Sequence, residues 1–430
     1  MTVAIALATL GCRSNHADTE EIKRLFPPPV FTLVPFDQEA QVYIVNTCTV
    51  TGRADRQSRQ LLNRARRRNA NALVIATGCY VSVDAPGLFA QVDGVFLVPG
   101  NRPQDILALV EEQLGLSPTP CIDNPCCFPH GLPRARPYLK VQDGCPYHCT
   151  YCLVSSARPG STSLPLDNVR DEAQLMAKQG AKEIVITGIH LGLYGRDLPG
   201  RPSLSLLLRE VARTVPHCLV RLSSLEPMDL DEALFSVIDG EANICHHLHL
   251  PVQSGSDAVL EAMGRPYTRR NMEDLVARAM SLIPDLTLGT DIIVGFPGET
   301  SSDFHQSASL VADLPFAYAH VFPYSLRPGT VAALLPDQVS EYEKKSRSAV
   351  LRQIAREKRN AWLNQAVGRQ MQVVLEGRAD DRNLVKGTSS YYHPVAVPHY
   401  QGPIPARVRV RAISVDRTAR LLECQMDENI

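Results

Sequence analysis

Three short apolar runs in the first eighty residues each end just before a cysteine. The runs are VAIALAT, VYIVN and LVIAT, and the cysteines that follow them are Cys12, Cys48 and Cys79. Helix-like stretches separate the runs, which is the pattern of a parallel sheet covered by helices on both faces. The carboxyl ends of parallel strands share one edge of a sheet, and ligands bind there. We therefore expect the three cysteines to converge on one site, with coincidence as the weaker alternative.

The overall composition is that of an ordinary globular protein with more than one core. The chain has 430 residues, of which 44% are hydrophobic and 21% charged. No apolar run approaches the roughly 20 residues that cross a bilayer. The start, MTVAIALATLGC, lacks the basic residues and the cleavage pattern of a signal peptide. We predict a cytoplasmic protein, in which twelve cysteines indicate metal binding or catalysis and not a disulfide framework.

The pattern of the remaining chain predicts three further parts after an N-terminal domain over residues 1–115. A proline-rich linker at 116–137 contains Cys121, Cys126 and Cys127, and we regard the adjacent pair as incidental. Alternating strands and helices over 138–366 predict a complete or partial barrel. Short alternating strands over 367–430 predict a small β-barrel. The expected class is α/β: a parallel-sheet domain, a partial TIM-like barrel and a C-terminal β-barrel. The predicted strands of the central part are EIVITG, LVRLSSLEP, HHLHLPVQ, LTLGTDIIVGF and AYAHVFPYS.

The segment DGCPYHCTYC is the strongest chemical signal. Cys145, Cys149 and Cys152 have the spacing C-x3-C-x2-C, dense enough for one loop to wrap a cluster. Cubane clusters take four thiolates, so three leave one iron open, as catalytic metal sites do. S-adenosylmethionine (SAM) can chelate that iron, and its reductive cleavage gives a 5′-deoxyadenosyl radical. Zinc is the alternative, with His148 as a further ligand, but zinc sites usually pair two C-x2-C units.

A basic stretch lies in the N-terminal part. Seven arginines and one aspartate lie between Arg53 and Arg68, although the formal net charge of the chain is only −1. Local and not summed charge attracts phosphate, so this stretch is a candidate polyanion site. The alternative is a solvated helix face.

Nine sequence segments are similar to those of one family. They are TLGCRSN, IVNTCTVTGRADRQSRQ, TGCY, VQDGCPYHCTYC, ITGIHLGLYG, RLSSLEP, LHLPVQSGSD, TDIIVGFPGET and FPYSLRPGT. The chain resembles the radical SAM methylthiotransferases over essentially its full length, with a methylthiotransferase domain, a radical SAM barrel and a C-terminal TRAM domain. Within them it is most similar to the MtaB type, which acts on threonylcarbamoyladenosine in tRNA.

The resemblance implies two 4Fe–4S clusters and SAM as cofactors. It assigns Cys145, Cys149 and Cys152 to the cluster that binds SAM, and Cys12, Cys48 and Cys79 to an auxiliary cluster. The resemblance also implies that five residues contact SAM. Each lies at the end of a predicted barrel strand, the face where barrel enzymes place their chemistry; the alternative is turn chemistry alone. These residues are Gly188, Glu226, Gln253, Ser254 and Asp291.

The implied reaction inserts a methylthio group at carbon 2 of N6-threonylcarbamoyladenosine at tRNA position 37, with SAM as methyl donor and radical source. Both clusters are then expected to face one cavity. The implied partners are a tRNA anticodon loop, an electron donor such as flavodoxin or ferredoxin, and a sulfur source, with no membrane. The candidate RNA-binding residues are Arg56, Arg59, Arg66, Arg67, Lys386 and Arg409.

Three alternatives stay open: a methylthiotransferase for isopentenyladenosine in tRNA, one for an aspartate of a ribosomal protein, and a non-catalytic RNA-binding protein with zinc or redox cysteines. The chain also departs from the family after the third central cysteine. Ser155, Pro159 and Thr162 stand where the family commonly has Pro, Gly and Arg, and Leu326 replaces a usual Pro, whereas Arg158 is retained. These changes bear on the loop beside the substrate and so on the exact nucleoside.

Overall fold

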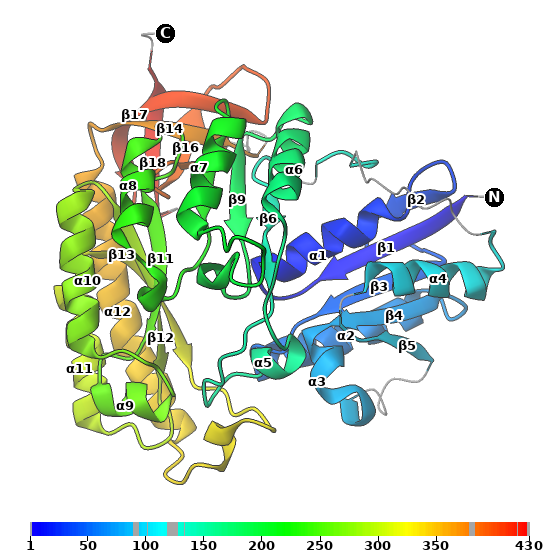
Figure 1. Cartoon of the computed structure of the whole chain (residues 1–430), viewed down its shortest axis with the longest axis horizontal. Helices are drawn as coiled ribbons and strands as arrows, with labels where there is room; N and C mark the ends of the chain where they lie inside the picture. The colour runs from blue at the N-terminus through cyan, green and yellow to red at the C-terminus, as the bar shows by residue number, and fades with distance from the viewer. Residues whose placement is uncertain are drawn as a thin grey trace. The chain divides into compact units, whose positions relative to one another are not determined.

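The computed structural model describes residues 2–88, 94–100, 102–117, 128–132, 134–377, 383–418 and 420–427. The chain forms two compact units, and neither is continuous in sequence. The first, here called the cysteine unit, comprises Met1–Pro133, Asp143–Thr162 and Ser325–Thr330. The second, the barrel unit, comprises Arg134–Gln142, Ser163–Tyr324 and Val331–Ile430. Figure 1 colours the chain from end to end and labels the elements of each unit.

The cysteine unit is built on a five-stranded sheet in the order β2-β1-β3-β4-β5, in which all neighbouring strands run parallel. β3 and β4 are buried along their whole length, as continuous apolar strands between two layers of helices should be. The strands are β1 (Val3–Thr9), β2 (Phe31–Val34), β3 (Val42–Thr47), β4 (Leu73–Gly78) and β5 (Val95–Val98). The helices are α1 (Arg13–Arg24), α2 (Gly52–Arg68), α3 (Cys79–Leu88), α4 (Pro103–Leu114) and the short α5 (Val154–Ala157).

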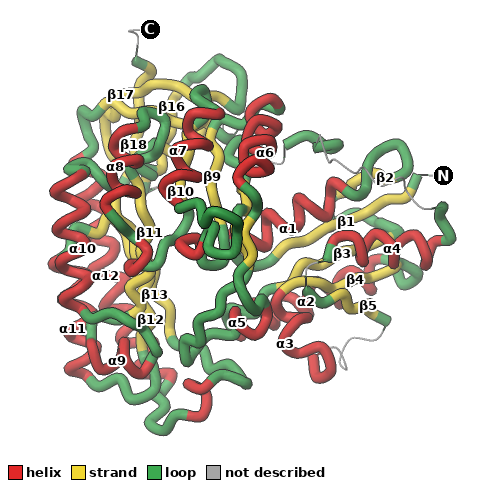
Figure 2. Tube along the Cα trace, in the orientation of Figure 1, coloured by secondary structure: helices red, strands yellow, loops and turns green. Residues whose placement is uncertain are grey.

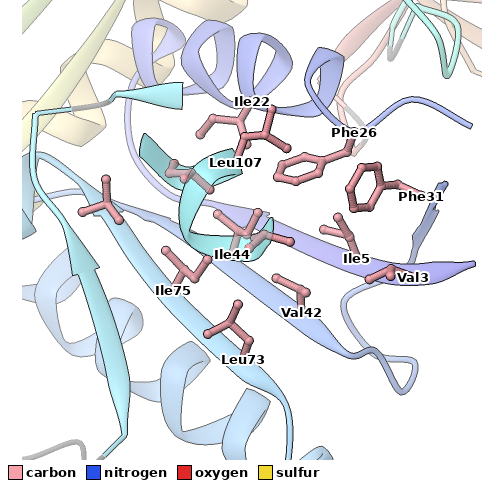
Figure 3. Packing of buried hydrophobic residues seen from close by; sticks show 13 residues of the cluster. Val3, Ile5, Ile22, Phe26, Phe31, Val42, Ile44, Leu73, Ile75 and Leu107 are labelled. Carbon is pink, nitrogen blue, oxygen red and sulfur yellow. The ribbon is translucent and has the colours of Figure 1, made fainter. Parts of the chain in front are cut away.

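Alternate side chains of the strands pack into two separate hydrophobic cores, one on each face of this sheet. On one face Ile22 of α1 and Leu107 of α4 pack over Ile5, Ile44 and Ile75 (Figure 3). On the other face the buried Leu62 and Ala65 of α2 pack over Tyr43, Val45 and Val74. Both faces being covered fixes the register of each strand, because a slip of one residue would exchange the two cores.

The barrel unit contains two three-stranded parallel sheets, β10-β9-β6 and β11-β12-β13. Parallel bridges join Val220 to Ile244 and Ser224 to His249, which link the two sheets into one open, partial barrel. Helices follow the strands in alternation, and α12 packs against β13 (Figure 2). The strands are β6 (Tyr138–Lys140), β9 (Glu183–Thr187), β10 (Leu219–Leu222), β11 (His247–Gln253), β12 (Thr287–Val294) and β13 (Phe316–Pro323). The α-helices are α6 (Leu166–Lys178), α7 (Leu204–Thr214), α8 (Glu232–Gly240), α9 (Asp257–Ala262), α10 (Arg269–Leu282), α11 (Ser301–Asp313) and α12 (Glu341–Gln365).

Several barrel helices begin at a side-chain cap. Thr268 and Asn271 form a capping box at the start of α10, and Thr300 and Asp303 form another at α11. Each box satisfies two backbone N–H groups that the first turn leaves unpaired. Short 3-10 helices lie at Leu191–Leu193, Pro227–Asp229 and Val331–Leu334, and the two-residue strands β7 (Gln142–Asp143) and β8 (Thr162–Ser163) pair with each other.

The C-terminal part of the barrel unit is a closed β-barrel in the order β14-β15-β16-β18-β17. Its interior is apolar and includes Val373, Val385, Val397, Val410 and Leu422. Closure removes the free strand edges that a small open sheet would expose. The strands are β14 (Gln370–Leu375), β15 (Leu384–Ser389), β16 (Pro394–Pro398), β17 (Ala406–Asp416) and β18 (Leu421–Met426).

The predicted fold class is confirmed: parallel-sheet α/β, a partial barrel and a small closed β-barrel. The sequence pattern did not predict the strands at 31–34, 95–98, 384–389 and 394–398, and LVRLSSLEP forms a strand only over its first four residues. The four-part domain division stays a prediction, and Cys121, Cys126 and Cys127 of its linker lie outside the described residues. None of the helices in the described stretches is at once long enough and apolar enough to cross a bilayer.

Candidate metal centre

Cys12, Cys48 and Cys79 lie at the carboxyl ends of three adjacent strands, β1, β3 and β4. Cys12 directly precedes α1, and Cys79 opens α3. The thiols of Cys48 and Cys79 each interact electrostatically with that of Cys12, so the three sulfurs share one site. The expected convergence therefore holds in the structure, and it follows from strand order alone.

Gly11 lets two of these cysteines approach each other. Its φ of +97° lies in the left-handed region, and a Cβ there would be 2.6 Å from both Cβ and Sγ of Cys48. Any other residue would strain the backbone and push Cys48 away from Cys12. The glycine is thus part of the site although it offers no ligand.

The three thiols differ in exposure. Cys12 is exposed, whereas Cys48 and Cys79 are buried. Burial, only partly opposed by a hydrogen bond from the Val50 N–H to Sγ, raises the pKa of Cys48 to about 12. Burial also raises the pKa of Cys79, against the opposing charge of Arg158. Because metals bind thiolates, metal uptake at this site would release protons.

Cys145, Cys149 and Cys152 lie on one closed loop of the cysteine unit. The Cys145 N–H donates to the Arg158 carbonyl at 3.1 Å, and the Cys152 N–H donates to the Cys149 carbonyl at 3.0 Å. The ends of the loop meet at Gly144, where a Cβ would be 2.6 Å from the Gly160 carbonyl oxygen. The Val154 N–H points at Cys152 Sγ from 3.3 Å. All three cysteines are partly exposed, so an incoming ligand can reach them.

Neither set of cysteines is spaced as tightly as the ligands of a single zinc ion. Thiolates around one tetrahedral zinc lie about 3.8 Å apart, from Zn–S bonds of about 2.3 Å. Among the described residues, one group of three or more His, Cys, Asp or Glu has all its ligand atoms within 4.8 Å, and it contains none of these cysteines. Each set offers three soft sulfur donors, which suit iron–sulfur clusters, with an amide N–H aimed at one of them, a contact that tunes such clusters.

Arg327 fixes the segment that follows Cys48 in the chain. Arg327 is 6% exposed and donates to Thr49 Oγ1 at 2.6 Å, and its guanidinium pairs with Asp55 at 2.6 Å. Ser325 Oγ accepts from the Gly52 N–H at 3.2 Å. These contacts explain why residues 325–330 belong to the cysteine unit. Nothing in the local sequence pairs them with residues about 270 positions away.

Comparison with known proteins decides between a radical SAM enzyme and a non-catalytic protein with zinc or redox cysteines. The family model described as the radical SAM superfamily matches residues 139–311, and the one described as uncharacterized protein family UPF0004 matches residues 4–100. A protein of Aquifex aeolicus (strain VF5) named threonylcarbamoyladenosine tRNA methylthiotransferase MtaB is 37% identical, covering 89% of this chain and 95% of the relative. The protein of that name from Bacillus subtilis (strain 168) is 33% identical, covering 95% and 93%.

The chain belongs to the radical SAM methylthiotransferase family. Members of the radical SAM superfamily use SAM and a 4Fe–4S cluster, so both are cofactors of this chain. The ribosomal protein uS12 methylthiotransferase RimO of Geobacter sulfurreducens is 34% identical, covering 91% of this chain and 90% of the relative. Among solved structures, the radical SAM methyltransferase TsrM from Kitasatospora setae shares the fold at a TM-score of 0.56 and 16% identity, covering 77% of each chain.

In this methylthiotransferase, the residues predicted to contact SAM lie at or near the carboxyl ends of barrel strands. Gly188 follows β9, and a Cβ on it would be 2.8 Å from Gln142 Oε1, which accepts from the His190 N–H. Glu226 follows β10 and pairs with Arg265, a buried residue that the sequence analysis did not single out. Whether Gly188 and Glu226 contact SAM stays a prediction.

Gln253 and Ser254 lie at the end of β11, where the register with β12 shifts. Gln253 has a φ of +70°, a rare conformation for a residue with a side chain. Ser254 is fully buried, and its hydroxyl lies 3.2 Å from that of Ser307 and accepts from the Ser256 N–H. The Ser254 hydroxyl is thus already hydrogen-bonded within its own loop. Gln253 is distinguished by its unusual backbone conformation.

Asp291 belongs to a polar group inside the barrel unit. Its Oδ1 lies 3.0 Å from Nε2 of His249, and His320 is the third member of the group. Nδ1 of His249 lies 3.2 Å from the hydroxyl of Tyr318. Asp291 therefore has a neighbouring imidazole that the sequence analysis missed, although HHLHLPVQ and AYAHVFPYS contain both histidines.

The arginines predicted to bind RNA divide into two kinds. Arg56 and Arg67 are exposed on α2, whereas Arg59 is half-buried and donates to the Tyr80 hydroxyl at 2.7 Å, and Arg66 is also half-buried. In the C-terminal barrel, Lys386 and Arg409 are exposed. Arg409 lines a pocket whose other walls include Lys182, His217, Tyr400 and Arg407. A basic pocket with one aromatic ring is suited to a phosphate next to a base.

Proposed function

We propose that this chain inserts a methylthio group at carbon 2 of N6-threonylcarbamoyladenosine at position 37 of tRNA. The observation that carries the proposal is a sequence identity of at least 31%, over at least 86% of the chain, to four proteins named threonylcarbamoyladenosine tRNA methylthiotransferase MtaB. SAM would serve as methyl donor and as radical source. Carbon 2 of adenine carries no acidic proton and no leaving group, so general acid–base catalysis cannot replace its hydrogen with sulfur.

Two clusters fit the cysteines of this chain. Cys145, Cys149 and Cys152 would hold the cluster that binds SAM, and Cys12, Cys48 and Cys79 would hold an auxiliary cluster. When bound, these groups supply the one-electron chemistry and the sulfur site that no side chain provides. The second set of cysteines supports a sulfur-inserting enzyme over a generic radical SAM enzyme, because SAM cleavage itself needs only the cluster of the central loop.

The remaining residues would bind and orient the two organic substrates. Gly188, Glu226, Gln253, Ser254 and Asp291 are our candidates for positioning SAM. Arg56 and Arg67 of α2, with Lys386 and Arg409 of the C-terminal barrel, are our candidates for phosphate contacts, which fix position without reading sequence. A single-stranded anticodon loop can present an unstacked base, each stack being worth about 1–3 kcal/mol. An electron donor such as flavodoxin or ferredoxin and a sulfur source complete the proposed system.

Mass spectrometry of tRNA nucleosides from a deletion strain tests the reaction and the substrate together. We expect the methylthio derivative of threonylcarbamoyladenosine to disappear and its unmodified parent to accumulate. Restoring the gene should reverse both changes, and restoring a Cys149→Ala variant should reverse neither. Loss of the methylthio isopentenyl nucleoside, or of the methylthio group on ribosomal protein uS12, would assign the chain to one of the other two family activities. Unchanged tRNA nucleosides together with an unchanged ribosomal protein uS12 would contradict all three.

A further inference from the structure

Arg158 is the first basic residue after the three-cysteine loop, and its side chain is almost completely buried. It is 8% exposed, and it lies in the cysteine unit together with all six predicted cluster ligands. A buried guanidinium is costly unless each of its N–H groups finds an acceptor. The five N–H groups of Arg158 all do so.

The acceptors come from separate segments of the chain. Nη1 donates to Asp143 Oδ1 at 2.8 Å and to Oδ2 at 2.9 Å. Nη2 donates to Asn15 Oδ1 at 2.8 Å and to Asp18 Oδ2 at 2.6 Å. Asn15 and Asp18 are each 1% exposed and belong to the first turns of α1, the helix that follows Cys12. The side chain therefore joins the base of the central loop to the helix next to the N-terminal cysteines.

The fifth N–H reaches a predicted cluster ligand. Nε of Arg158 donates to Sγ of Cys79 at 3.2 Å. The main chain of the same residue accepts the Cys145 N–H at 3.1 Å. One residue thus contacts a cysteine of each set, through its side chain in one case and through its backbone in the other.

We propose that Arg158 couples the two cluster sites: its guanidinium raises the reduction potential of the auxiliary cluster through the hydrogen bond to Cys79, while its backbone holds the loop of the other cluster at a fixed place beside it. This inference rests on the proposed function, since it needs a cluster on Cys12, Cys48 and Cys79. Arg158 is a positioning and tuning residue and not a catalytic one.

The sign of the effect follows from charge. Hydrogen bonds to cluster sulfurs and nearby positive charge stabilise the reduced cluster, which carries one more negative charge. An arginine side chain stays protonated in proteins, and Asp18 and Asp143 accept hydrogen bonds from this guanidinium. The bond from Arg158 to Cys79 is therefore charge-assisted.

A merely structural ion pair would hold α1 against the loop without affecting the potential. The measurement that separates the two roles is the midpoint potential of the auxiliary cluster alone. A Cys145→Ala/Cys149→Ala/Cys152→Ala parent keeps the N-terminal set as its one intact set of predicted cluster ligands, so the cluster signal after anaerobic reconstitution is assigned to that site. The variants on this full-length parent are Arg158→Gln and Arg158→Lys.

Arg327→Gln is the matched control. Arg327 is also a buried arginine of the cysteine unit. Its guanidinium bonds to oxygen atoms of Asp55 and of Thr49, the residue after Cys48, whereas Arg158 bonds to a sulfur. We expect Arg158→Gln to bind about four irons and to lower the equilibrium constant for cluster reduction at least tenfold, about 59 mV for one electron. Arg158→Lys keeps the charge and should shift the potential less, and the control should match the parent.

Each outcome of this experiment either supports or overturns the proposed role of Arg158. If the parent itself holds no iron, the two-cluster function fails, and the role of Arg158 fails with it. If the parent binds iron and both Arg158 variants keep its potential, the proposal is overturned. It is also overturned if neither variant binds iron, because a purely structural residue accounts for that result. If Arg158→Gln alone loses iron, the shift in Arg158→Lys relative to the control decides the question by the same measurement.

Discussion

The two cysteine sites of this protein are built in opposite ways. Cys145, Cys149 and Cys152 lie within eight residues of one loop, whereas Cys12, Cys48 and Cys79 are 67 positions apart at their extremes and meet only because β1, β3 and β4 are neighbours. The first site needs a loop that closes on itself. The second needs a correctly ordered parallel sheet. The contrast teaches that local spacing can bring one set of cysteines together while sheet topology brings together another in the same compact unit.

Removing the central cysteines should have the largest effect. We expect Cys145→Ala/Cys149→Ala/Cys152→Ala to abolish both SAM cleavage and methylthio transfer, because no open iron is left for SAM. The iron content should fall from about eight to about four per chain, since each cubane holds four. Anaerobic iron and sulfide analysis with a 5′-deoxyadenosine assay measures both. Residual SAM cleavage in this variant would contradict the assignment of Cys145, Cys149 and Cys152 to the cluster that binds SAM.

Removing a single N-terminal cysteine should separate the two sites. We expect Cys48→Ala to abolish methylthio transfer but to retain SAM cleavage, with about four irons left per chain. Cys218→Ala is the control, because Cys218 is also buried but lies in the barrel unit. A Cys48→Ala protein that still bound about eight irons would show that this cysteine is not a ligand.

Two glycines test the same contrast without changing a ligand. Gly11→Ala should lower the iron content toward four by displacing Cys48, and Gly144→Ala should impair the central loop and SAM cleavage. Gly115→Ala is the matched control, since Gly115 has a φ of +61° and a Cβ placed on it would have no atom within 4 Å among the described residues. It should cost about 1 kcal/mol of stability and leave all iron in place. Equal iron loss in the three variants would point to general unfolding.

A change confined to the barrel unit should spare both cysteine sites. Glu183 is fully buried and pairs with Arg221 at 2.6 Å. Burial favours the protonated acid, but Arg221 and Arg136 outweigh it and lower the pKa of Glu183 below 4.5. Because the folded-state pKa is depressed, the pair stabilises the protein fully above the unfolded pKa and less as the pH falls through the folded one.

We expect Glu183→Gln to lower the free energy of unfolding by about 3–5 kcal/mol at pH 7, because a buried guanidinium loses its partner. The difference from wild type should shrink as the pH falls below 4.5. Denaturant unfolding at several pH values measures this, and iron analysis of the native variant checks that both clusters remain. Iron loss from native Glu183→Gln would mean that the sites are not independent of the barrel.

The N-terminal site could be predicted because it follows from strand pattern alone. VAIALAT, VYIVN and LVIAT are long enough and apolar enough to be recognised as buried strands, and their order along the chain places the cysteines at one edge. The strands at 31–34 and 95–98 are only four residues long, so neither shows a clear period. In the tail, β15 and β16 contain glycine or proline, which mask the alternation.

The polar contacts could not be predicted, because they join distant segments through side chains. Arg158 reaches Asn15 and Asp18 across 140 positions or more, and Arg327 reaches Asp55 across more than 270. No periodicity encodes such pairs. They also explain why residues 143–162 and 325–330 pack with the cysteine unit, although their sequence places them among barrel strands.

The unequal exposure of the N-terminal cysteines makes one of them more open to oxidation than the others. Cys12 is exposed, while Cys48 and Cys79 are buried. Dioxygen and peroxide would thus reach the Cys12 sulfur before those of Cys48 and Cys79, and accessible sulfur is oxidised first. An incoming cluster would also meet Cys12 first, so oxidative damage and cluster loading would begin at the same residue.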